Sequence, residues 1–320
     1  MHRWFGPTHA VRGVSFSVEP GEVFGYIGPN GAGKTTSMRI LATLQEASAG
    51  DAFVDGFSVS EDPDRVRARL GFMPDYFGAY QDMNVREYLD FFARAYGLRG
   101  EERRRAIAHT MDFTRLEPLA DKPIDGLSKG MKQRLCLGRT MIHDPSVMVL
   151  DEPAAGLDPR ARIELREMIA QLAEAGKAVL ISSHILTELA EFCDRVAIIE
   201  HGSIVAAGTV EQISSRVEET VTVEARIAPG GGATRDAAAP PRDAAALAEW
   251  LGRDEHASDV ERVRDLVRFR YGVPPERRDA ALADLLAALV GEGFRVAAFG
   301  ARARSLEDVF LHVTGREDRP

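Results

Sequence analysis

A glycine-rich segment near the N-terminus has the residue types and spacing of a polyphosphate-binding loop, G-x-x-x-x-G-K-[ST]. Its residues are Gly28, Pro29, Asn30, Gly31, Ala32, Gly33, Lys34, Thr35 and Thr36. Glycine lacks a Cβ atom, so successive backbone N–H groups can face an anion, and a helix that starts there adds a favourable dipole. Lys34 can reach the β- and γ-phosphates, and the Thr35 hydroxyl can bind Mg²⁺. The segment predicts a nucleoside triphosphate site, which by itself fits transporters, kinases, GTPases and helicases alike.

Two carboxylates follow an apolar run further along the chain. Val147–Leu150 is followed directly by Asp151 and Glu152. A strand buried on both faces cannot hold charges in its middle, but at its C-terminal end they emerge beside the ligand crevice of an α/β sheet. We expect Asp151 to hold Mg²⁺ through water and Glu152 to polarise the attacking water. The pair alone also fits two solvated acids at a strand end; the phosphate loop upstream favours catalysis.

The elements that position these residues follow from hydrophobic periodicity. Residues 11–27 alternate like strands, with Val14, Phe16 and Val18 on one face, and Val23–Ile27 predicts a buried strand. Further predicted elements are a hairpin over 50–59, a helix over 65–70, a strand over 71–73, helices within 84–120, and a helix over 159–174 between the strands 147–150 and 178–181. Strand, helix, strand with apolar strands indicates an α/β fold with a parallel sheet covered on both faces.

Beyond about residue 213 the composition changes, which predicts a second domain over 214–320. A Gly/Ala/Pro-rich stretch at about 229–246 is expected to be a flexible loop. Around it we expect strands over 221–227, 266–271 and 294–299, and helices over 244–250, 277–290 and 306–313. This order suggests a small α+β domain.

Leu127–Arg134 resembles the signature motif of the ATP-binding cassette (ABC) family, usually written LSGGQ. Ser128 and Gly130 sit where a helix starts and can present donors to a phosphate. The resemblance implies that Ser128, Lys129, Gly130 and Met131 serve the γ-phosphate of ATP bound to the opposite subunit. It therefore implies a head-to-tail dimer, either a homodimer or a cassette heterodimer, with ATP and Mg²⁺ as cofactors.

The remaining family motifs follow in the family's order. Ala155–Asp158 resembles the D-loop, with Asp158 crossing the dimer interface, and Ser182–His184 resembles the H-switch, with His184 bridging the γ-phosphate and Glu152. Phe5, or alternatively Trp4, falls where the family stacks an aromatic ring on adenine. The resemblance covers residues 5–210 and implies a P-loop NTPase core over 1–213, with antiparallel β and helical subdomains, the latter at about 75–135.

The C-terminal stretch 305–315 looks like the tail of drug- and antibiotic-exporter ATPases, a subgroup with an accessory domain after the cassette.

Three departures from the family pattern stand out. Asp75 occupies the place of the Q-loop glutamine, and we expect it still to bind Mg²⁺ but with altered geometry or affinity. Lys129 and Met131 replace the usual Gly and Gln. Finally, fewer residues precede Phe5 than the family normally has before its adenine-stacking ring. This suggests either a truncated edge strand or a true chain start further upstream.

Composition narrows the choice of partners. The chain has 320 residues and a net charge of −9, so it lacks the basic balance of a nucleic-acid binder, and we expect no nucleic-acid partner. No apolar run approaches the roughly 18 residues that a membrane-spanning helix needs, and no secretory signal is evident. Cys136 and Cys193 lack metal-ligand spacing, which suggests a reduced cytosolic protein. We therefore expect a peripheral ATPase subunit on the cytoplasmic face of the cell membrane, where it drives an integral membrane permease in export.

Two other interpretations stay open at this point. One is a soluble ABC ATPase without a transport role. Against it, the chain has one set of motifs, and too few residues separate Lys34 from Ser128 for a long inserted coiled coil. The other is an ATP-binding module with impaired hydrolysis, which Asp75 supports and which Glu152 and His184 oppose.

Overall fold

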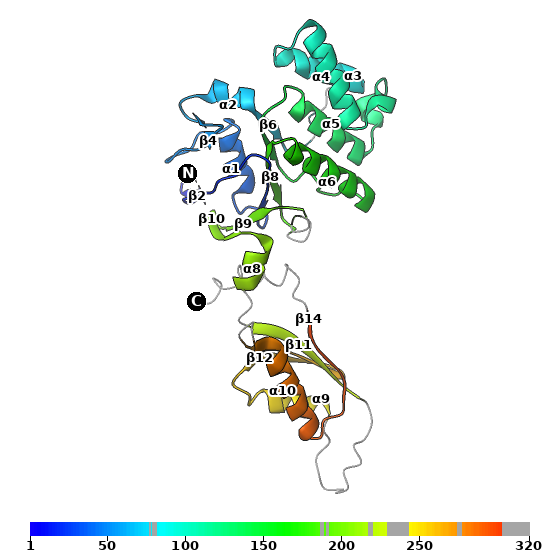
Figure 1. The fold of residues 1–320 in the computed structure, drawn as a ribbon. Coiled ribbons are helices and arrows are strands. Elements are labelled where there is room, and N and C mark those ends of the chain that lie inside the picture. The colour runs from blue at the N-terminus through cyan, green and yellow to red at the C-terminus, as the bar shows by residue number, and fades with distance from the viewer. Residues whose placement is uncertain are drawn as a thin grey trace. The chain divides into compact units, whose positions relative to one another are not determined.

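The computed structural model describes residues 1–76, 78, 82–185, 189, 192–216, 220–228, 243–273 and 277–302. These fall into two compact units, one ending at Val210 and the other beginning at Glu211 (Figure 1). The helix α8 (Val210–Arg216) spans this boundary. The predicted helix over 306–313, the exporter-like tail motif and most of the stretch 229–246 lie outside the described residues. Among the described residues, no helix combines the length and the apolar character needed to cross a bilayer.

A six-stranded sheet forms the centre of the first unit, in the order β10-β9-β3-β8-β7-β6. Its strands are β3 (Val23–Ile27), β6 (Leu70–Met73), β7 (Val147–Leu150), β8 (Ala178–Ser183), β9 (Arg195–Glu200) and β10 (Ser203–Gly208). All neighbouring pairs are parallel except β9 with β10. Every residue of β3 and β8 is buried, as expected for central parallel strands. The predicted α/β class with a parallel sheet is confirmed.

Helices and short hairpins complete this core. The helices are α1 (Lys34–Leu41), α2 (Pro63–Arg69) and α6 (Pro159–Glu174), and the hairpins pair β1 (Arg3–Phe5) with β2 (Thr8–Val11) and β4 (Phe53–Val54) with β5 (Phe57–Ser58). The predicted strand at Val14–Val18 is wrong. Val14 is buried and Ser15 and Ser17 are exposed, but this segment pairs with no strand in the described part of the chain. Alternation set the side-chain pattern there, and Val14 exchanges backbone hydrogen bonds with Met1, but this pairing does not extend into a strand.

A helical group inserts between β6 and β7. It contains α3 (Val85–Ala95), α4 (Gly100–Phe113), the 3₁₀ turns η1 (Glu117–Leu119) and η2 (Ile124–Gly126), and α5 (Lys129–Met141). A capping box between Asn84 and Glu87 starts α3. Buried Tyr88, Leu89 and Met111 contribute to a core of its own. The group is therefore a separate layer, visible in Figure 1 apart from α1 and α2, and α5 extends beyond the expected end at residue 135.

The second unit is an antiparallel sheet covered by two helices. Its order along the chain is β11 (Thr220–Ile227), α9 (Ala244–Leu251), β12 (Ala257–Val263), β13 (Leu266–Gly272), α10 (Arg278–Gly291) and β14 (Val296–Arg302). The strands lie in the order β12-β13-β11-β14, which is the split β-α-β or ferredoxin-like topology. Hydrophobic pattern missed β12 because this edge strand is polar and mostly exposed. The last strand begins at Val296, since Phe294 instead closes the turn after α10 and fills the core.

Candidate functional site

The phosphate loop connects the buried strand β3 to the start of α1. Gly33 caps α1 with a left-handed φ of 104°, and a Cβ atom there would lie 2.6 Å from the carbonyl oxygen of Ala10. A Cβ atom on Gly28 would overlap the carbonyl oxygen of Ile199. Only glycine fits either position. The loop is therefore folded tightly against the neighbouring segments, and α1 begins directly after it.

Lys34 is the central cation of the loop and is only 6% exposed. Its Nζ atom donates hydrogen bonds to the carbonyl oxygens of Gly28 at 2.6 Å and Pro29 at 3.3 Å. The same atom lies 3.4 Å from Oε1 of Glu152. The ammonium group thus lies among two loop carbonyl oxygens and one carboxylate. These contacts pre-position a charge-assisted donor for an anion in the loop.

Glu152 lies just past the end of β7 with a left-handed φ of 48°. Its backbone N–H donates to the Ser182 hydroxyl at 2.9 Å, which fixes this unusual turn. Its Oε2 atom lies 2.8 Å from Nδ1 of His184, while Oε1 faces Lys34. The carboxylate therefore bridges a cation of the phosphate loop and an imidazole at the end of β8. A carboxylate held in this way can accept a proton from a water molecule beside the terminal phosphate.

Asp151 is fully buried, and the Ser182 hydroxyl donates to its Oδ1 atom at 2.6 Å. Burial raises the pKa of the Asp151 carboxyl, the Asp75 and Glu152 carboxylates raise it further, and hydrogen bonds from Ser182 and Thr35 oppose the shift. Its Oδ2 atom is buried without a partner in hydrogen-bond geometry. Such an orphaned oxygen beside a threonine hydroxyl fits the oxygen ligands that Mg²⁺ prefers.

The described residues contain no cluster of three or more His, Cys, Asp or Glu side chains able to hold a metal ion alone. A Mg²⁺ ion held by Asp151 and Thr35 would therefore need further oxygen ligands, such as those of a triphosphate and of water. Asp75 follows β6 and acts electrostatically on Asp151, so the structure places it near this site.

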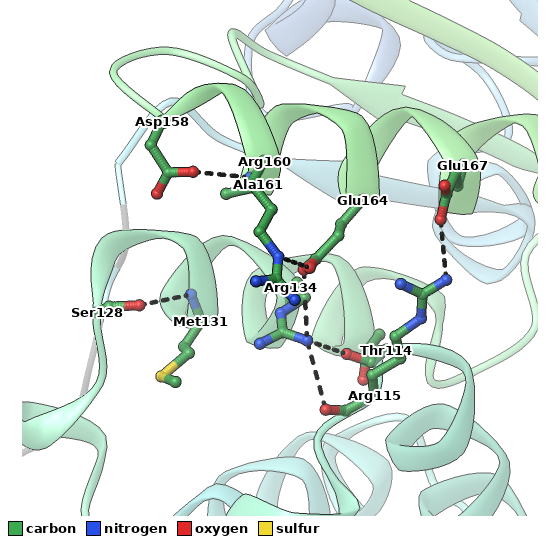
Figure 2. A network of polar contacts seen from close by, with 10 residues as sticks. All are labelled: Thr114, Arg115, Ser128, Met131, Arg134, Asp158, Arg160, Ala161, Glu164 and Glu167. Carbon is green, nitrogen blue, oxygen red and sulfur yellow. Dashed lines mark hydrogen bonds and ion pairs between the residues drawn. The ribbon is translucent and has the colours of Figure 1, made fainter.

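The signature residues and the D-loop start two neighbouring helices. Ser128 caps α5, and its hydroxyl accepts from the Met131 N–H at 3.3 Å. Asp158 caps α6, and its carboxylate accepts from the Ala161 N–H at 2.9 Å. Figure 2 shows both caps at the same end of the helix pair. Ser128 and Asp158 are exposed, and none of the described contacts joins either residue to the phosphate loop.

The two candidate adenine-stacking rings lie in the β1–β2 hairpin. The Trp4 ring stacks on His9, with ring centroids 4.2 Å apart, and on His2 at 5.4 Å. The Arg3 guanidinium lies over the Phe5 ring, with its Cζ atom 4.7 Å from the ring centroid. Phe5 is 44% exposed. Both rings remain accessible, and the stacking of Trp4 on imidazoles of its own hairpin favours Phe5 for a nucleotide base.

The structure thus brings Lys34, Thr35, Asp151, Glu152 and His184 into one site, and none of the described contacts joins Ser128 or Asp158 to these residues. Sequence reasoning missed the role of Ser182, which donates to Asp151 and accepts from Glu152. A serine next to the last residue of a buried strand, two positions before the predicted His184, was the available signal.

The geometry is that of a nucleoside triphosphatase, and comparisons with known proteins give its family. Residues 11–155 match the family described as "ABC transporter". The Nod factor export ATP-binding protein I of Burkholderia orbicola is 36% identical over 318 residues, covering 99% of this chain and 96% of that protein. The chain belongs to the ATP-binding proteins of the ABC transporter family, which hydrolyse ATP.

Other relatives agree with this assignment. The daunorubicin resistance ATP-binding protein DrrA2 of Streptomyces coeruleorubidus is 33% identical over 320 residues, covering 98% of this chain and 93% of that protein. A solved ATP-binding subunit of an ABC transporter is 30% identical with a TM-score of 0.61, covering 67% of this chain and 90% of that one. The similarity to relatives therefore includes the second unit as well as the cassette.

Proposed function

We propose that this chain powers an exporter as one of two cassettes on the cytoplasmic face of the membrane, bound to an integral membrane permease. The observation that carries the proposal is the carboxylate of Glu152 held between Lys34 and His184. This arrangement supplies a base and two groups that can interact with the terminal phosphate. Export follows from similarity along the whole chain to proteins named for export and drug resistance. The cargo depends on the permease.

In the proposed reaction, the triphosphate of ATP enters the loop and takes over the Lys34 contact with Glu152. The freed carboxylate accepts a proton from the attacking water, and the γ-phosphate leaves ADP. Thr35 and Asp151 would hold Mg²⁺, which neutralises charge on the phosphate oxygens. His184 orients Glu152 and contacts the γ-phosphate. Catalysis is mainly positioning and charge stabilisation.

A head-to-tail dimer completes each site. Ser128 and Gly130 start a helix whose N–H groups and dipole suit a phosphate. Ser128 is exposed and Gly130 is half-buried, and none of the described contacts joins them to the phosphate loop of their own subunit. The N-terminus of α5 from a second cassette therefore covers an anion bound in that loop. Hydrolysis removes the phosphate that joins the two halves.

The permease contact is proposed for a groove between the helical group and the core, here called the α1–α5 groove. Two connected cavities of about 450 and 310 Å³ form it, and both are lined by Leu44, Phe72 and Arg139. Tyr76 and Tyr96 add exposed aromatic surface at its two ends. An exposed aromatic groove of this kind fits an apolar helix from a partner.

Replacing Leu44 with aspartate is expected to reduce the permease recovered with the chain by about tenfold, because a charge would have to be buried in the contact. Leu44 is 65% exposed, so the fold should tolerate the change. The measurement is co-purification from membranes that contain both proteins. Phe53→Asp is the matched control, since Phe53 is 68% exposed and lies outside this groove. Equal recovery of both variants would reject the groove.

Replacing Asp75 with glutamine is expected to change the Mg²⁺ concentration needed for half-maximal hydrolysis by about threefold or more, because a charge close to Asp151 is lost. The measurement is ATP turnover across a Mg²⁺ titration. Asp144→Asn, at an exposed residue paired with Lys177, is the control. An unchanged Mg²⁺ dependence would remove Asp75 from the metal site.

The proposed function as a whole is tested by purifying the chain from membranes together with the permease and measuring ATP turnover in liposomes. We expect hydrolysis that the permease stimulates. A chain that hydrolyses ATP but never associates with a membrane protein supports the soluble ATPase instead. A chain that binds ATP without turnover, alone or with the permease, supports the binding module.

A further inference from the structure

The signature and the D-loop contact each other within one subunit. A Cβ atom on Gly130 in α5 would lie 3.0 Å from the Cβ atom of Ala161 in α6, so the first turns of the two helices are in close contact. The Lys129 ammonium lies directly over Gly156 in the D-loop, where any Cβ atom would displace it. The two exposed caps, Ser128 and Asp158, are thus parts of one continuous surface.

A polar network joins the same two helices behind their caps. The Nη1 atom of Arg134 in α5 lies 3.9 Å from Oε2 of Glu164 in α6. It also lies 3.4 Å and 3.5 Å from the carbonyl oxygens of Arg115 and Thr114 at the end of α4. Arg115 in turn pairs with Glu167 of α6 at 2.9 Å. Figure 2 shows that α4, α5 and α6 meet at this point.

The position of this network along the helices is informative. The same number of residues separates Ser128 from Arg134 as separates Asp158 from Glu164, which is about 9 Å along each axis. The Arg134–Glu164 pair therefore crosses between the helices at matched heights. The two side chains are 17% and 24% exposed, so water screens this pair less than an open surface pair.

From these contacts we infer that Arg134 and Glu164 are positioning residues that fix Ser128 and Asp158 relative to each other. A partner subunit then meets the signature and the D-loop as one rigid surface. The inference rests on the proposed dimer for its consequence, but the clamp itself is a property of the single subunit. Loss of the clamp weakens closure over the partner's ATP and leaves the subunit's own phosphate loop intact.

The test uses Arg134→Met and Glu164→Gln in a Glu152→Gln parent, whose dimer forms with ATP but does not turn over. In each variant we expect the ATP concentration for half-maximal dimerisation to rise at least about fivefold. Binding of a fluorescent ATP analogue to dilute monomer should not change. The exchanged pair, Arg134→Glu with Glu164→Arg, should recover part of the dimerisation that Arg134→Glu alone loses, because the ion pair returns while the Arg134 contacts with the carbonyl oxygens of Thr114 and Arg115 do not. That rescue separates a specific pair from general loss of stability.

Arg160→Ala is the matched control. Arg160 pairs with the same Glu164 but from within α6, and its side chain is 90% exposed. Its removal deletes an ion pair without disconnecting the helices, so dimerisation should match the parent. If Arg160→Ala and Glu164→Gln weaken dimerisation equally, or if the exchanged pair gives no recovery, the clamp is rejected.

Hydrogen exchange of the nucleotide-free monomer tests the clamp without any dimer. We expect peptides covering the starts of α5 and α6 to exchange at least about threefold faster in Arg134→Met, while the central sheet keeps its protection. Unchanged exchange at both helix starts would overturn the inference. If Arg134→Met speeds exchange as expected but the Glu152→Gln parent never dimerises, the proposed function is rejected and the clamp is retained.

Discussion

Replacing Glu152 with glutamine is expected to slow ATP hydrolysis by at least about a hundredfold, because the proton acceptor for the attacking water is lost. Glutamine has the size of glutamate and still offers a polar partner to His184. The backbone N–H of residue 152 still donates to the Ser182 hydroxyl. The substitution removes the charge that Lys34 faces at 3.4 Å. ATP affinity should therefore stay equal or increase.

The measurement is phosphate release in a single turnover, together with the size of the protein in ATP and Mg²⁺. A stable dimer that persists with ATP and disappears with ADP is the expected result. Glu117→Gln, an acid-to-amide change at an exposed residue of η1, should behave like the parent. Full turnover by Glu152→Gln would assign the base to another residue.

The placement of these residues was predictable because each motif carries its own geometric requirement. A glycine pattern before a helix fixes an anion site, and acids directly after an apolar strand must emerge at the sheet's edge. The structure places Lys34, Asp151, Glu152 and His184 together as those rules require. Local rules sufficed here because the residues lie at strand ends that the parallel sheet brings side by side.

Other features depend on partners that are distant in sequence. The Val14–Val18 alternation predicts a strand, but in the described structure the segment joins no sheet, and the backbone pairing of Val14 with Met1 does not extend along it. The edge strand β12 is the reverse case. Its hydrophobic alternation is too weak to predict a strand, yet it forms one because it pairs with β13. The Arg134–Glu164 clamp joins helices that are separated by the whole strand β7. Periodicity along one segment cannot reveal such pairings.

Replacing Lys34 with methionine is expected to weaken ATP binding by at least about tenfold, because a buried charge-assisted donor to the phosphates disappears. Methionine keeps much of the length of the side chain but leaves the Gly28 carbonyl and Oε1 of Glu152 without their cation. The variant should therefore also be less stable than the parent without nucleotide. Nucleotide titration of the monomer and thermal unfolding measure the two effects separately.

Lys122→Met removes the same charge from the helical group and should leave ATP affinity unchanged. The two Lys34 effects also differ in how they respond to a second change. In a Glu152→Gln background, Lys34→Met no longer leaves a carboxylate without its cation. The loss of stability caused by Lys34→Met should therefore shrink, while the loss of ATP affinity remains. If both costs shrink together, Lys34 acts mainly as the counter-ion of Glu152. If both persist, the Lys34–Glu152 contact is incidental and the loop alone determines the position of the ammonium.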